Sequence, residues 1–330
     1  MTILALTDST NPWHSFWIRF GQYAPDLNLE IVISNHPKAI EDLVSGDTLF
    51  LYRYRIEWGE IANSLPELRK RKVHIIADVD DYLWKAPGWD GERIINYTKA
   101  LRECHKITCS THSLKELLEI MFPKQKVLLA PNSTPPIRTK NSCDVHSHLK
   151  LCWTGAPWTR PEDLRILQPL AKWLNDQTFN IVWRHIGYAE GRLSFAEAIG
   201  VRPENVETLP ILPHKDYLDA IEGHIGLAPL NKDTFNEFKS ELKLLEFSGL
   251  GIPWIASDVT PYRELCERWG WKGRLCQKPS EWIVHLKALL DENIRDREGA
   301  ALKQLSHSQQ SYKQSVFFWD QLLASVKIKN

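Results

Sequence analysis

Residues 236–258, NEFKSELKLLEFSGLGIPWIASD, contain the pattern that decides the fold. Lys239, Lys243 and Glu246 are spaced at i, i+4 and i+7, which predicts that they share one face of a helix. Glycines then end the helix, and the apolar run at residues 252–256 predicts a buried strand. A helix, a glycine stop and a buried strand make one αβ unit of a doubly wound sheet.

The charged face of this predicted helix has the chemistry of a diphosphate site. Free backbone N–H groups and the helix dipole favour anions at a helix start, and Lys239 and Lys243 add positive charge there. Glu246, two turns further on, can accept hydrogen bonds from ribose hydroxyls. Charged residues at this spacing more often form a solvated helix face. Spacing alone therefore leaves open both a solvated face and a diphosphate site.

The remaining sequence alternates strand and helix patterns in two halves. Such alternation is typical of parallel, doubly wound sheets with helices on both faces. We also predict one long helix over residues 161–175 and a terminal helix over residues 312–326. The predicted strands cover residues 3–6, 29–34, 48–52, 73–77, 106–110 and 126–130 in the first half, and 149–153, 179–183, 206–209 and 225–229 in the second.

A polar, proline-containing segment separates the two halves and predicts a domain boundary. We therefore expect a Rossmann-like domain over residues 1–140, a linker over 141–148 and a second Rossmann-like domain over 149–308. Residues 309–330 are expected to form a C-terminal helix that packs back on the first domain.

The string K-S-x-x-K-x-x-E-x-x-x-x-G-x-P-x-x-x-S, from Lys239 to Ser257, resembles the donor-site signature of GT-B glycosyltransferases of the group 1 or family 4 type. The resemblance implies an α/β protein of two Rossmann-like domains that face a central cleft. It also implies that the second domain holds a nucleoside diphosphate sugar.

The resemblance assigns roles within this string. Lys239 and Lys243 would contact the diphosphate and stabilise its charge as it departs, and Ser240 would complete the phosphate cradle. Glu246 would hold the ribose.

The sugar end of the site departs from the family pattern. Many members carry a second glutamate eight residues before the ribose glutamate, where this chain has Phe238. Glu237 is adjacent and is a candidate for that contact, with Asn236 beside it at the end of the expected sugar loop.

Two further donor contacts are expected at strand ends. Gly155 follows a predicted strand in the turn that opens the second domain, where a glycine lets backbone N–H groups approach a phosphate. Arg184 is predicted at the carboxyl end of the next strand, where open α/β sheets bind ligands. The alternatives to these ligand contacts are an ordinary βα turn at the glycine and a surface arginine that contacts no ligand.

Aspartates after a predicted strand of the first half are the candidate catalytic groups. By the resemblance, Asp80 or Asp81 lies on the acceptor side and orients or deprotonates a hydroxyl. Asp78 and Asp80 also spell D-x-D, the metal motif of GT-A glycosyltransferases. Cys143, His146 and His148 offer a conceivable zinc site but lack a fourth ligand at recognisable spacing, so no metal site is expected.

The sequence therefore predicts a glycosyltransferase that moves a sugar from a nucleoside diphosphate sugar to a hydroxyl of a glycan, a lipid-linked molecule or a small molecule. By resemblance it would be retaining and metal-independent, with no cofactor beyond the donor. Three alternatives stay open: a GT-A-type enzyme using Asp78 and Asp80, a nucleotide-sugar epimerase, and a non-catalytic sugar-nucleotide-binding subunit.

Composition limits the partners. A formal net charge of zero gives no sign of nucleic-acid binding. Six cysteines without a C-x-x-C pair, and no signal-peptide pattern at the start, predict a cytoplasmic protein with reduced thiols. A lipid-linked acceptor would imply peripheral membrane contact.

Overall fold

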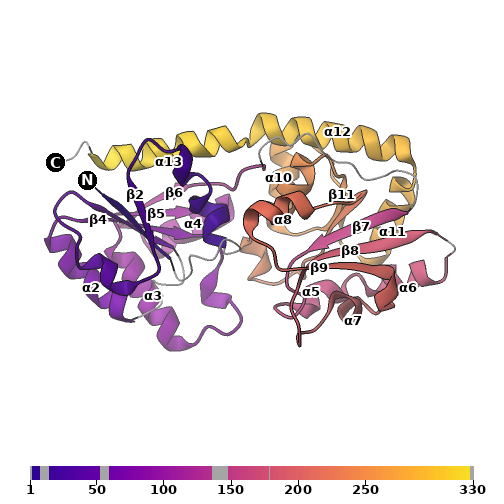
Figure 1. Cartoon of the computed structure of the whole chain (residues 1–330), viewed down its shortest axis with the longest axis horizontal. Helices are drawn as coiled ribbons and strands as arrows, with labels where there is room; N and C mark the ends of the chain where they lie inside the picture. Colours follow the sequence, from indigo (N-terminus) through magenta and orange to yellow (C-terminus); the bar gives the residue numbers. More distant parts are fainter. Residues whose placement is uncertain (1, 8–14, 53–58, 136–147, 178, 328–330) are drawn as a thin grey trace. The chain divides into compact units, whose positions relative to one another are not determined.

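The computed structural model describes all residues except 1, 8–14, 53–58, 136–147, 178 and 328–330 (Figure 1). The chain divides into two compact units. The first comprises Met1–Asn132, Phe238–Ser240 and Lys313–Asn330, and the second comprises Ser133–Glu237 and Glu241–Tyr312. Nearly all of the predicted linker, with Cys143 and His146, lies outside the described residues.

The first unit is built on a six-stranded parallel sheet in the order β2-β1-β3-β4-β5-β6. Its strands are almost wholly apolar because parallel sheets are covered on both faces. The strands are β1 (Ile3–Leu6), β2 (Ile31–Ser34), β3 (Thr48–Tyr52), β4 (His74–Val79), β5 (Lys106–Cys109) and β6 (Lys126–Leu129).

Alternate residues of β3 show how both faces of this sheet are buried. Leu49 and Leu51 belong to the core on one face. Phe50 points to the other face, where its ring stacks on Phe20 at 4.3 Å and meets Trp319 edge-on at 5.5 Å. Trp319 belongs to the C-terminal helix, so the prediction that this helix packs back on the first domain is confirmed. The helical segments are η1 (Trp17–Gly21, a π-helix), η2 (Ala24–Asp26), η3 (Pro37–Ile40), α2 (Gly59–Lys70), η4 (Leu83–Lys85), α3 (Gly91–Glu103), α4 (His112–Met121) and α13 (Tyr312–Lys327).

The second unit is built on another six-stranded parallel sheet, in the order β12-β11-β10-β7-β8-β9. This is the strand order of a dinucleotide-binding Rossmann sheet. The strands are β7 (Leu149–Thr154), β8 (Ile181–Tyr188), β9 (Val206–Pro210), β10 (Ile225–Ala228), β11 (Trp254–Ser257) and β12 (Leu275–Cys276).

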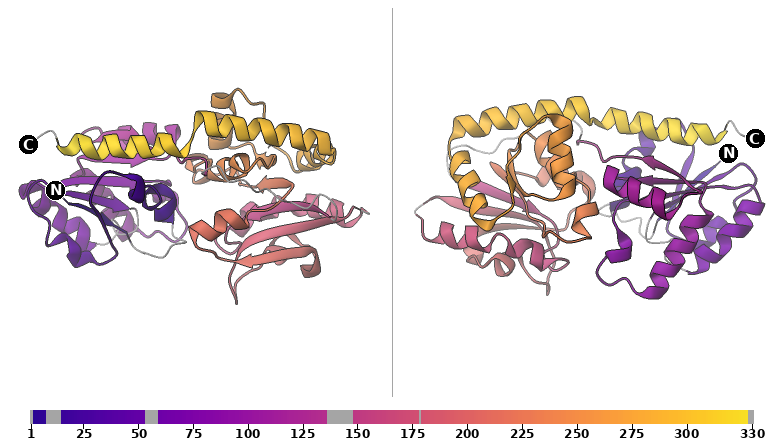
Figure 2. Two further views of the ribbon diagram at one scale, coloured as in Figure 1. Left: turned by 45° about the horizontal axis from the view of Figure 1, so that its top comes forward. Right: turned by 180° about the vertical axis from the view of Figure 1, so that it is seen from behind.

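Two separate apolar cores cover the two faces of the second sheet. Trp153 and Leu227 belong to one core, whereas Cys152 and Ala228, their neighbours in sequence, belong to the other. The views in Figure 2 show helices on both faces of each sheet, as a doubly wound fold requires. The helices are α5 (Pro161–Arg165), α6 (Gln168–Asn175), α7 (Phe195–Ile199), η5 (Pro203–Asn205), α8 (His214–Ala220), η6 (Asn236–Phe238), α9 (Leu242–Gly249), α10 (Thr260–Trp269), α11 (Pro279–Leu289) and α12 (Glu292–Gln309).

The chain order defines a switch point in the second sheet. From β7 the chain proceeds outward through β8 and β9, then returns to place β10 on the other side of β7. Ligands of open α/β sheets bind outside the carboxyl ends of the strands at such a point. Thr154 ends β7 there, and Leu230 follows β10.

Two predicted helices differ from the structure. Residues 161–175 form two helices, α5 and α6, because Pro169 has no N–H to continue the first one. The helix expected to carry Lys239, Lys243 and Glu246 begins only at Leu242. Lys239 precedes it, so the predicted common helical face of all three residues is wrong.

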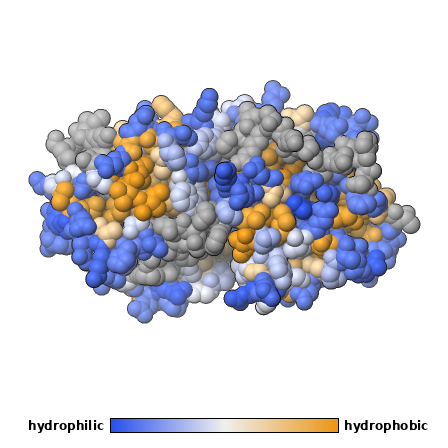
Figure 3. Space-filling model, viewed as in Figure 1, coloured by the Kyte–Doolittle hydropathy of each residue, from blue (hydrophilic) through white to orange (hydrophobic). Residues whose placement is uncertain are grey.

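The surface is mostly hydrophilic, with local apolar areas. Figure 3 shows hydrophobic residues gathered over β2, the edge strand of the first sheet, where Val32 is 45% exposed. Within the described ranges, every helix is too short or too polar to cross a lipid bilayer.

Candidate functional site

The turn after β7 brings two glycines into close contact. Gly155 has φ 138° and Gly187 has φ 129°, a region that disfavours side chains. A Cβ atom on Gly187 would lie 2.2 Å from the carbonyl oxygen of Gly155. The N–H of Gly155 donates to the carbonyl of Ile186 at 2.8 Å, so this particular N–H is engaged and not open to a phosphate.

A buried histidine supports this turn from within the sheet. Nε2 of His185 lies 3.0 Å from the carbonyl oxygen of Gly155. Burial lowers the pKa of His185 to about 4, so the ring is neutral and its Nε2–H donates to that carbonyl. The ring is stacked among Trp153 and Phe195, with all three centroid separations at 5.3 Å. His185 therefore fixes the orientation of the Gly155 peptide.

Lys243 lies against the same turn from the first turn of α9. Its ammonium donates to the carbonyl oxygen of Thr154 and lies 3.2 Å from the Thr154 hydroxyl. It also lies 5.5 Å from the centroid of the Trp153 ring, within cation–π distance. A positive charge is thus held at the carboxyl end of β7, where the resemblance predicts a diphosphate.

Glu246 is buried beneath this charge, one turn further along α9. The carboxylate is 3% exposed, and its Oε2 accepts a hydrogen bond from the Tyr217 hydroxyl at 2.7 Å. Burial raises the pKa of Glu246 to about 7, against the opposing effects of Lys243 and the Tyr217 hydrogen bond. Glu246 therefore changes protonation near neutral pH.

Tyr217 links Glu246 back to β7. Its hydroxyl lies 3.0 Å from the Thr154 hydroxyl. An ionised carboxylate only accepts and a phenol has one proton, so Tyr217 donates to Glu246 and the Thr154 hydroxyl donates to Tyr217. Lys243, Thr154, Tyr217 and Glu246 form one directional chain of hydrogen bonds across the switch point. We call these four residues the switch-point cluster.

The expected sugar loop is tied to the start of α5. Asn236 is fully buried, and its Nδ2 donates to Oδ1 of Asp163 and to the carbonyl of Asn231, both at 2.9 Å. Arg160 pairs with Asp163 at 3.0 Å and also contacts Asp233 within the loop. These contacts fix Asn236 in place, and its Oδ1 is a buried acceptor that has no partner among the described residues.

Glu237 has a structural role in the second unit, at the start of α10. Its Oε2 accepts hydrogen bonds from the backbone N–H of Thr260, at 2.9 Å, and from the Thr260 hydroxyl. Glu237 therefore caps the start of α10. A role for Glu237 at the donor sugar stays a prediction.

Arg184 does not lie at a strand end, because β8 continues to Tyr188. Its guanidinium pairs with Glu207 at 3.3 Å and lies 4.0 Å from Glu222. The predicted strand boundary is wrong, and two carboxylates already offset the charge that was expected to meet a phosphate.

Lys239 and Ser240 belong to the short segment that groups with the first unit. The segment is held there by Phe238, whose ring centroid lies 5.0 Å from that of Tyr82. Phosphate contacts of Lys239 and Ser240 stay predictions.

The three aspartates of the first unit have distinct surroundings. Asp78 is fully buried and forms a bidentate pair with Arg19, at 2.8 and 2.9 Å. Asp80 is half-buried and accepts a hydrogen bond from the Tyr52 hydroxyl at 2.8 Å. Asp81 is also half-buried. Because Arg19 occupies both oxygens of Asp78, the structure opposes a D-x-D metal site, and the described residues contain no cluster of three metal-ligating side chains.

Sequence reasoning missed His185, Tyr217 and Arg160. His185 and Tyr217 sit in apolar patterns that predict only core positions. Arg160 had a usable signal, because it follows Gly155 by five residues and directly precedes the proline that opens α5.

Comparisons with known proteins agree with this architecture. No protein-family model and no curated protein matches the chain. Among solved structures, a mutant form of S. aureus TarM, in complex with UDP, α-GlcNAc-glycerol and fondaparinux, superposes with a TM-score of 0.62 at 9% identity, over 89% of this chain and 58% of that one. The pneumococcal O-GlcNAc transferase GtfA, in complex with UDP and GlcNAc, gives 0.60 at 16% identity, over 89% and 60%.

A third similar structure is the N-terminal domain of Candida albicans trehalose-6-phosphate phosphatase, with a TM-score of 0.62 at 10% identity, over 98% of this chain and 96% of that one. The chain spans about three fifths of the TarM and GtfA chains and nearly the whole of the third structure. The predicted GT-B fold, with its two doubly wound domains, is confirmed.

Proposed function

We propose that this chain is a glycosyltransferase that moves a sugar from a nucleoside diphosphate sugar to a hydroxyl acceptor. The observation that carries the proposal is the switch-point cluster of Lys243, Thr154, Tyr217 and Glu246 at the carboxyl end of β7. It combines a fixed positive charge with a buried carboxylate where Rossmann sheets bind nucleotides.

In this proposal the cluster binds the nucleoside diphosphate. The Lys243 ammonium has three N–H donors, so it can keep its contact with Thr154 and still bind the β-phosphate. As the sugar leaves, charge grows on that phosphate, and a fixed ammonium in a partly dry site stabilises it. Glu246, held by Tyr217, accepts hydrogen bonds from the ribose hydroxyls.

The proposed acceptor side is in the first unit. Asp80 and Asp81 are half-buried carboxylates after β4, and either can orient or deprotonate a hydroxyl. The proposed reaction retains configuration and needs no metal ion. The ion pair between Asp78 and Arg19 supports the proposal that no metal ion is needed, since it engages one of the two D-x-D carboxylates. The acceptor is a glycan, a lipid-linked molecule or a small molecule.

Similar structures guide the choice of donor to test. The TarM and GtfA structures both contain UDP. Uridine nucleotides are therefore the first candidates, with GDP and ADP as the comparison set.

A thermal-shift panel tests the proposal. UDP, GDP, ADP and their common sugar derivatives are added to the protein in EDTA, and the melting temperature is recorded. A ligand that binds only the folded state raises the melting temperature by mass action. We expect one nucleotide series to do so and its sugar form to release nucleoside diphosphate when acceptors are supplied. A flat panel contradicts the proposal.

A non-catalytic sugar-nucleotide-binding subunit is the second candidate. Phe238 packs against Tyr82 where related enzymes place an acidic sugar contact, and the similar Candida structure comes from a protein named as a phosphatase. Donor binding without turnover favours this candidate. Conversion of the donor without an acceptor would indicate an epimerase, and loss of activity in EDTA with recovery in Mn²⁺ would indicate a metal-dependent transferase.

A further inference from the structure

A buried tyrosine of the first unit contacts one of the two candidate acceptor carboxylates. Tyr52 is the last residue of β3, and Asp80 directly follows β4, the next strand of the sheet. Tyr52 is fully buried, and its hydroxyl lies 2.8 Å from Oδ2 of Asp80 and 2.7 Å from Oγ of Ser15. Asp80 is half-buried, so part of its surface remains in contact with solvent.

The direction of these hydrogen bonds follows from the groups involved. An ionised carboxylate only accepts hydrogen bonds, and a phenol has one proton to donate. Tyr52 therefore donates to Asp80, and the Ser15 hydroxyl donates to Tyr52. The switch-point cluster of the second unit has the same order, in which a hydroxyl donates to a tyrosine and the tyrosine donates to a carboxylate.

The backbone of Asp80 is fixed as well. Ser110 directly follows β5 and is only 1% exposed, and its hydroxyl donates to the carbonyl oxygen of Asp80 at 2.9 Å. The strands β3 and β5 lie on opposite sides of β4 in the sheet. Both neighbouring strands therefore position Asp80, one through its carboxylate and the other through its peptide.

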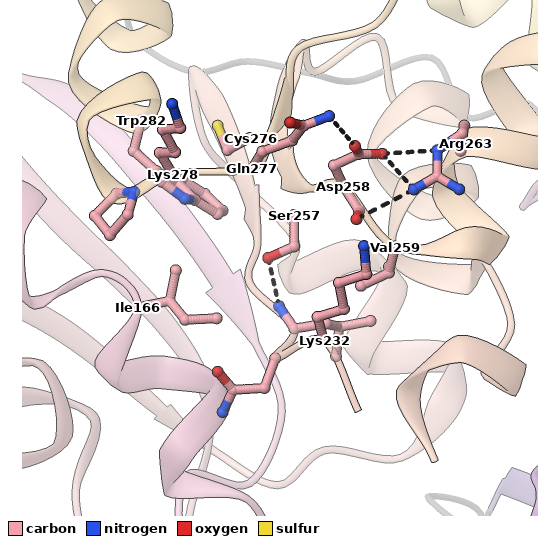
Figure 4. A pocket seen from close by; sticks show the side chains of 13 residues that line it. Ile166, Lys232, Ser257, Asp258, Val259, Arg263, Cys276, Gln277, Lys278 and Trp282 are labelled. Atoms are coloured by element: carbon pink, nitrogen blue, oxygen red, sulfur yellow. Dashed lines mark hydrogen bonds and ion pairs between the residues drawn. The ribbon is translucent and has the colours of Figure 1, made fainter. Parts of the chain in front are cut away.

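A carboxylate beside a cavity of the second unit is held in a different way. The cavity, of about 500 Å³, lies at the carboxyl ends of β10, β11 and β12 (Figure 4). Its Asp258 accepts hydrogen bonds from Nε of Arg263 at 3.0 Å and from Nε2 of Gln277 at 2.7 Å, and Figure 4 shows Asp258 between these two side chains. Asp258 is thus part of an ion pair, in which a guanidinium offsets its charge.

The hydroxyl of Tyr52 is neutral, so it orients the carboxylate of Asp80 without offsetting its charge. A carboxylate has about four acceptor positions, so Asp80 can keep the hydrogen bond from Tyr52 and accept another from a substrate hydroxyl. A group that takes a proton from a substrate must lie within hydrogen-bond distance of it, and a small displacement slows the reaction strongly. The contacts of Tyr52 and Ser110 meet this requirement at Asp80.

We infer that Tyr52 is a positioning residue for the acceptor, which sets Asp80, and not Asp81, to accept the proton of the attacking hydroxyl. The inference rests on the proposed glycosyl transfer. In that reaction the acceptor oxygen bonds to the anomeric carbon, and the bond from this carbon to the β-phosphate oxygen breaks. The bonding electrons leave with the nucleoside diphosphate, and the hydroxyl proton passes to Asp80 and then to solvent.

A double-mutant cycle tests the inference. Tyr52→Phe, which keeps the ring and removes the hydroxyl, is made in the wild type, in Asp80→Asn and in Asp81→Asn. Tyr97→Phe removes another fully buried tyrosine hydroxyl from the core of the first unit and is the matched control. The donor is the UDP, GDP or ADP sugar that gives the largest thermal shift, and the acceptor probes are glycerol, glucose and N-acetylglucosamine. Release of nucleoside diphosphate measures kcat, and melting temperatures verify folding.

We expect Tyr52→Phe to lower kcat by about tenfold, because the carboxylate loses its fixed orientation. The dissociation constant of the nucleoside diphosphate, which the proposal places in the second unit, should not change. In the Asp80→Asn background Tyr52→Phe should have almost no further effect, since a positioning residue acts only through the group that it orients. In the Asp81→Asn background it should keep its full effect, and Tyr97→Phe should leave kcat unchanged.

Several results overturn the inference. An equal loss from Tyr52→Phe in the wild type and in Asp80→Asn would mean that the tyrosine acts on the fold alone. Disappearance of its effect in Asp81→Asn would assign the proton to that residue instead, and weaker binding of the nucleoside diphosphate would move its effect to the donor. These outcomes leave the proposed transfer intact. Absence of release by the wild type with every acceptor overturns the proposed transfer itself, and this inference with it.

Discussion

The hydroxyl of Tyr217 lies 2.7 Å from Oε2 of Glu246, although 29 residues separate them in sequence. Through Thr154 the same hydroxyl connects to the end of β7. In the proposed function this contact keeps the ribose carboxylate in position and opposes the rise of its pKa on burial.

Tyr217→Phe removes this hydrogen bond and leaves the ring in place. The bond lowers the pKa of Glu246, so its loss should raise that pKa. The increase of activity with pH should therefore occur at a higher pH. We also expect kcat/KM to fall by about tenfold at neutral pH. Tyr97→Phe, in the core of the first unit, is the control and should leave the pH profile unchanged. An unshifted profile in Tyr217→Phe would rule out the positioning role.

Glu246 should make stability depend on pH. Burial raises its pKa from 4.5 to about 7, so the folded state holds the proton more tightly than the unfolded chain does. This contribution is fully present below pH 4.5 and is lost as the pH rises through about 7. The free energy of unfolding of the wild type, relative to Glu246→Gln, should fall by about 3 kcal/mol over that window. Denaturant titrations at several pH values measure it, and a constant difference would contradict the burial argument.

Lys243→Ala should weaken nucleotide binding more than folding. The ammonium is the fixed charge at the end of β7, so we expect kcat/KM to fall by about a hundredfold or more. Lys172→Ala, at an exposed position of α6, is the control for general charge. Lys239→Ala should act in the same direction if the predicted phosphate contact of Lys239 exists. Wild-type kinetics in both variants would remove the phosphate-binding role.

Gly187→Ala should destabilise the second unit. Its Cβ would meet the carbonyl oxygen of Gly155 at 2.2 Å, and φ 129° adds backbone strain, for a cost of about 3 kcal/mol. Gly191 has φ 71° but open space around it, so Gly191→Ala should cost only about 1 kcal/mol. Equal melting temperatures for the two variants would show that the close approach of Gly187 to Gly155 does not affect the stability of the second unit.

Asp78→Asn tests the structural role of the D-x-D sequence. It leaves the buried charge of Arg19 uncompensated, which should cost about 3–5 kcal/mol of stability. Asp80→Asn should leave stability nearly unchanged but lower activity. Added Mn²⁺ should rescue neither variant, because the carboxylate of Asp78 serves the ion pair. A metal-dependent gain in stability for the wild type would reverse this assignment.

The strands of both sheets were largely predictable because buried parallel strands are short, continuous apolar runs. Ile3–Leu6 and Thr48–Tyr52 have the predicted bounds. β12 was missed because a strand of two residues is too short to show an alternation of apolar and polar residues. Leu275 and Cys276 form a strand because they pair with β11. The start of α9 was misplaced because helical spacing of charges also occurs where no helix forms.

The site was predictable only where a motif lies in one segment. Lys243 and Glu246 are three residues apart, so the sequence placed them together. The partners that define their chemistry are distant: Thr154 lies 89 residues from Lys243, and Arg19 lies 59 residues from Asp78. Pairing over such separations is fixed by the fold, and a single sequence carries no local signal for it.

The most direct test of the proposed function is a calorimetric titration of the nucleoside diphosphate that gives the largest thermal shift, into wild type and Lys243→Ala, both in EDTA. We predict binding to the wild type at one site, and binding to Lys243→Ala that is weaker by about tenfold or more. Equal affinity of the two proteins, or no nucleoside diphosphate that binds the wild type, would contradict the account.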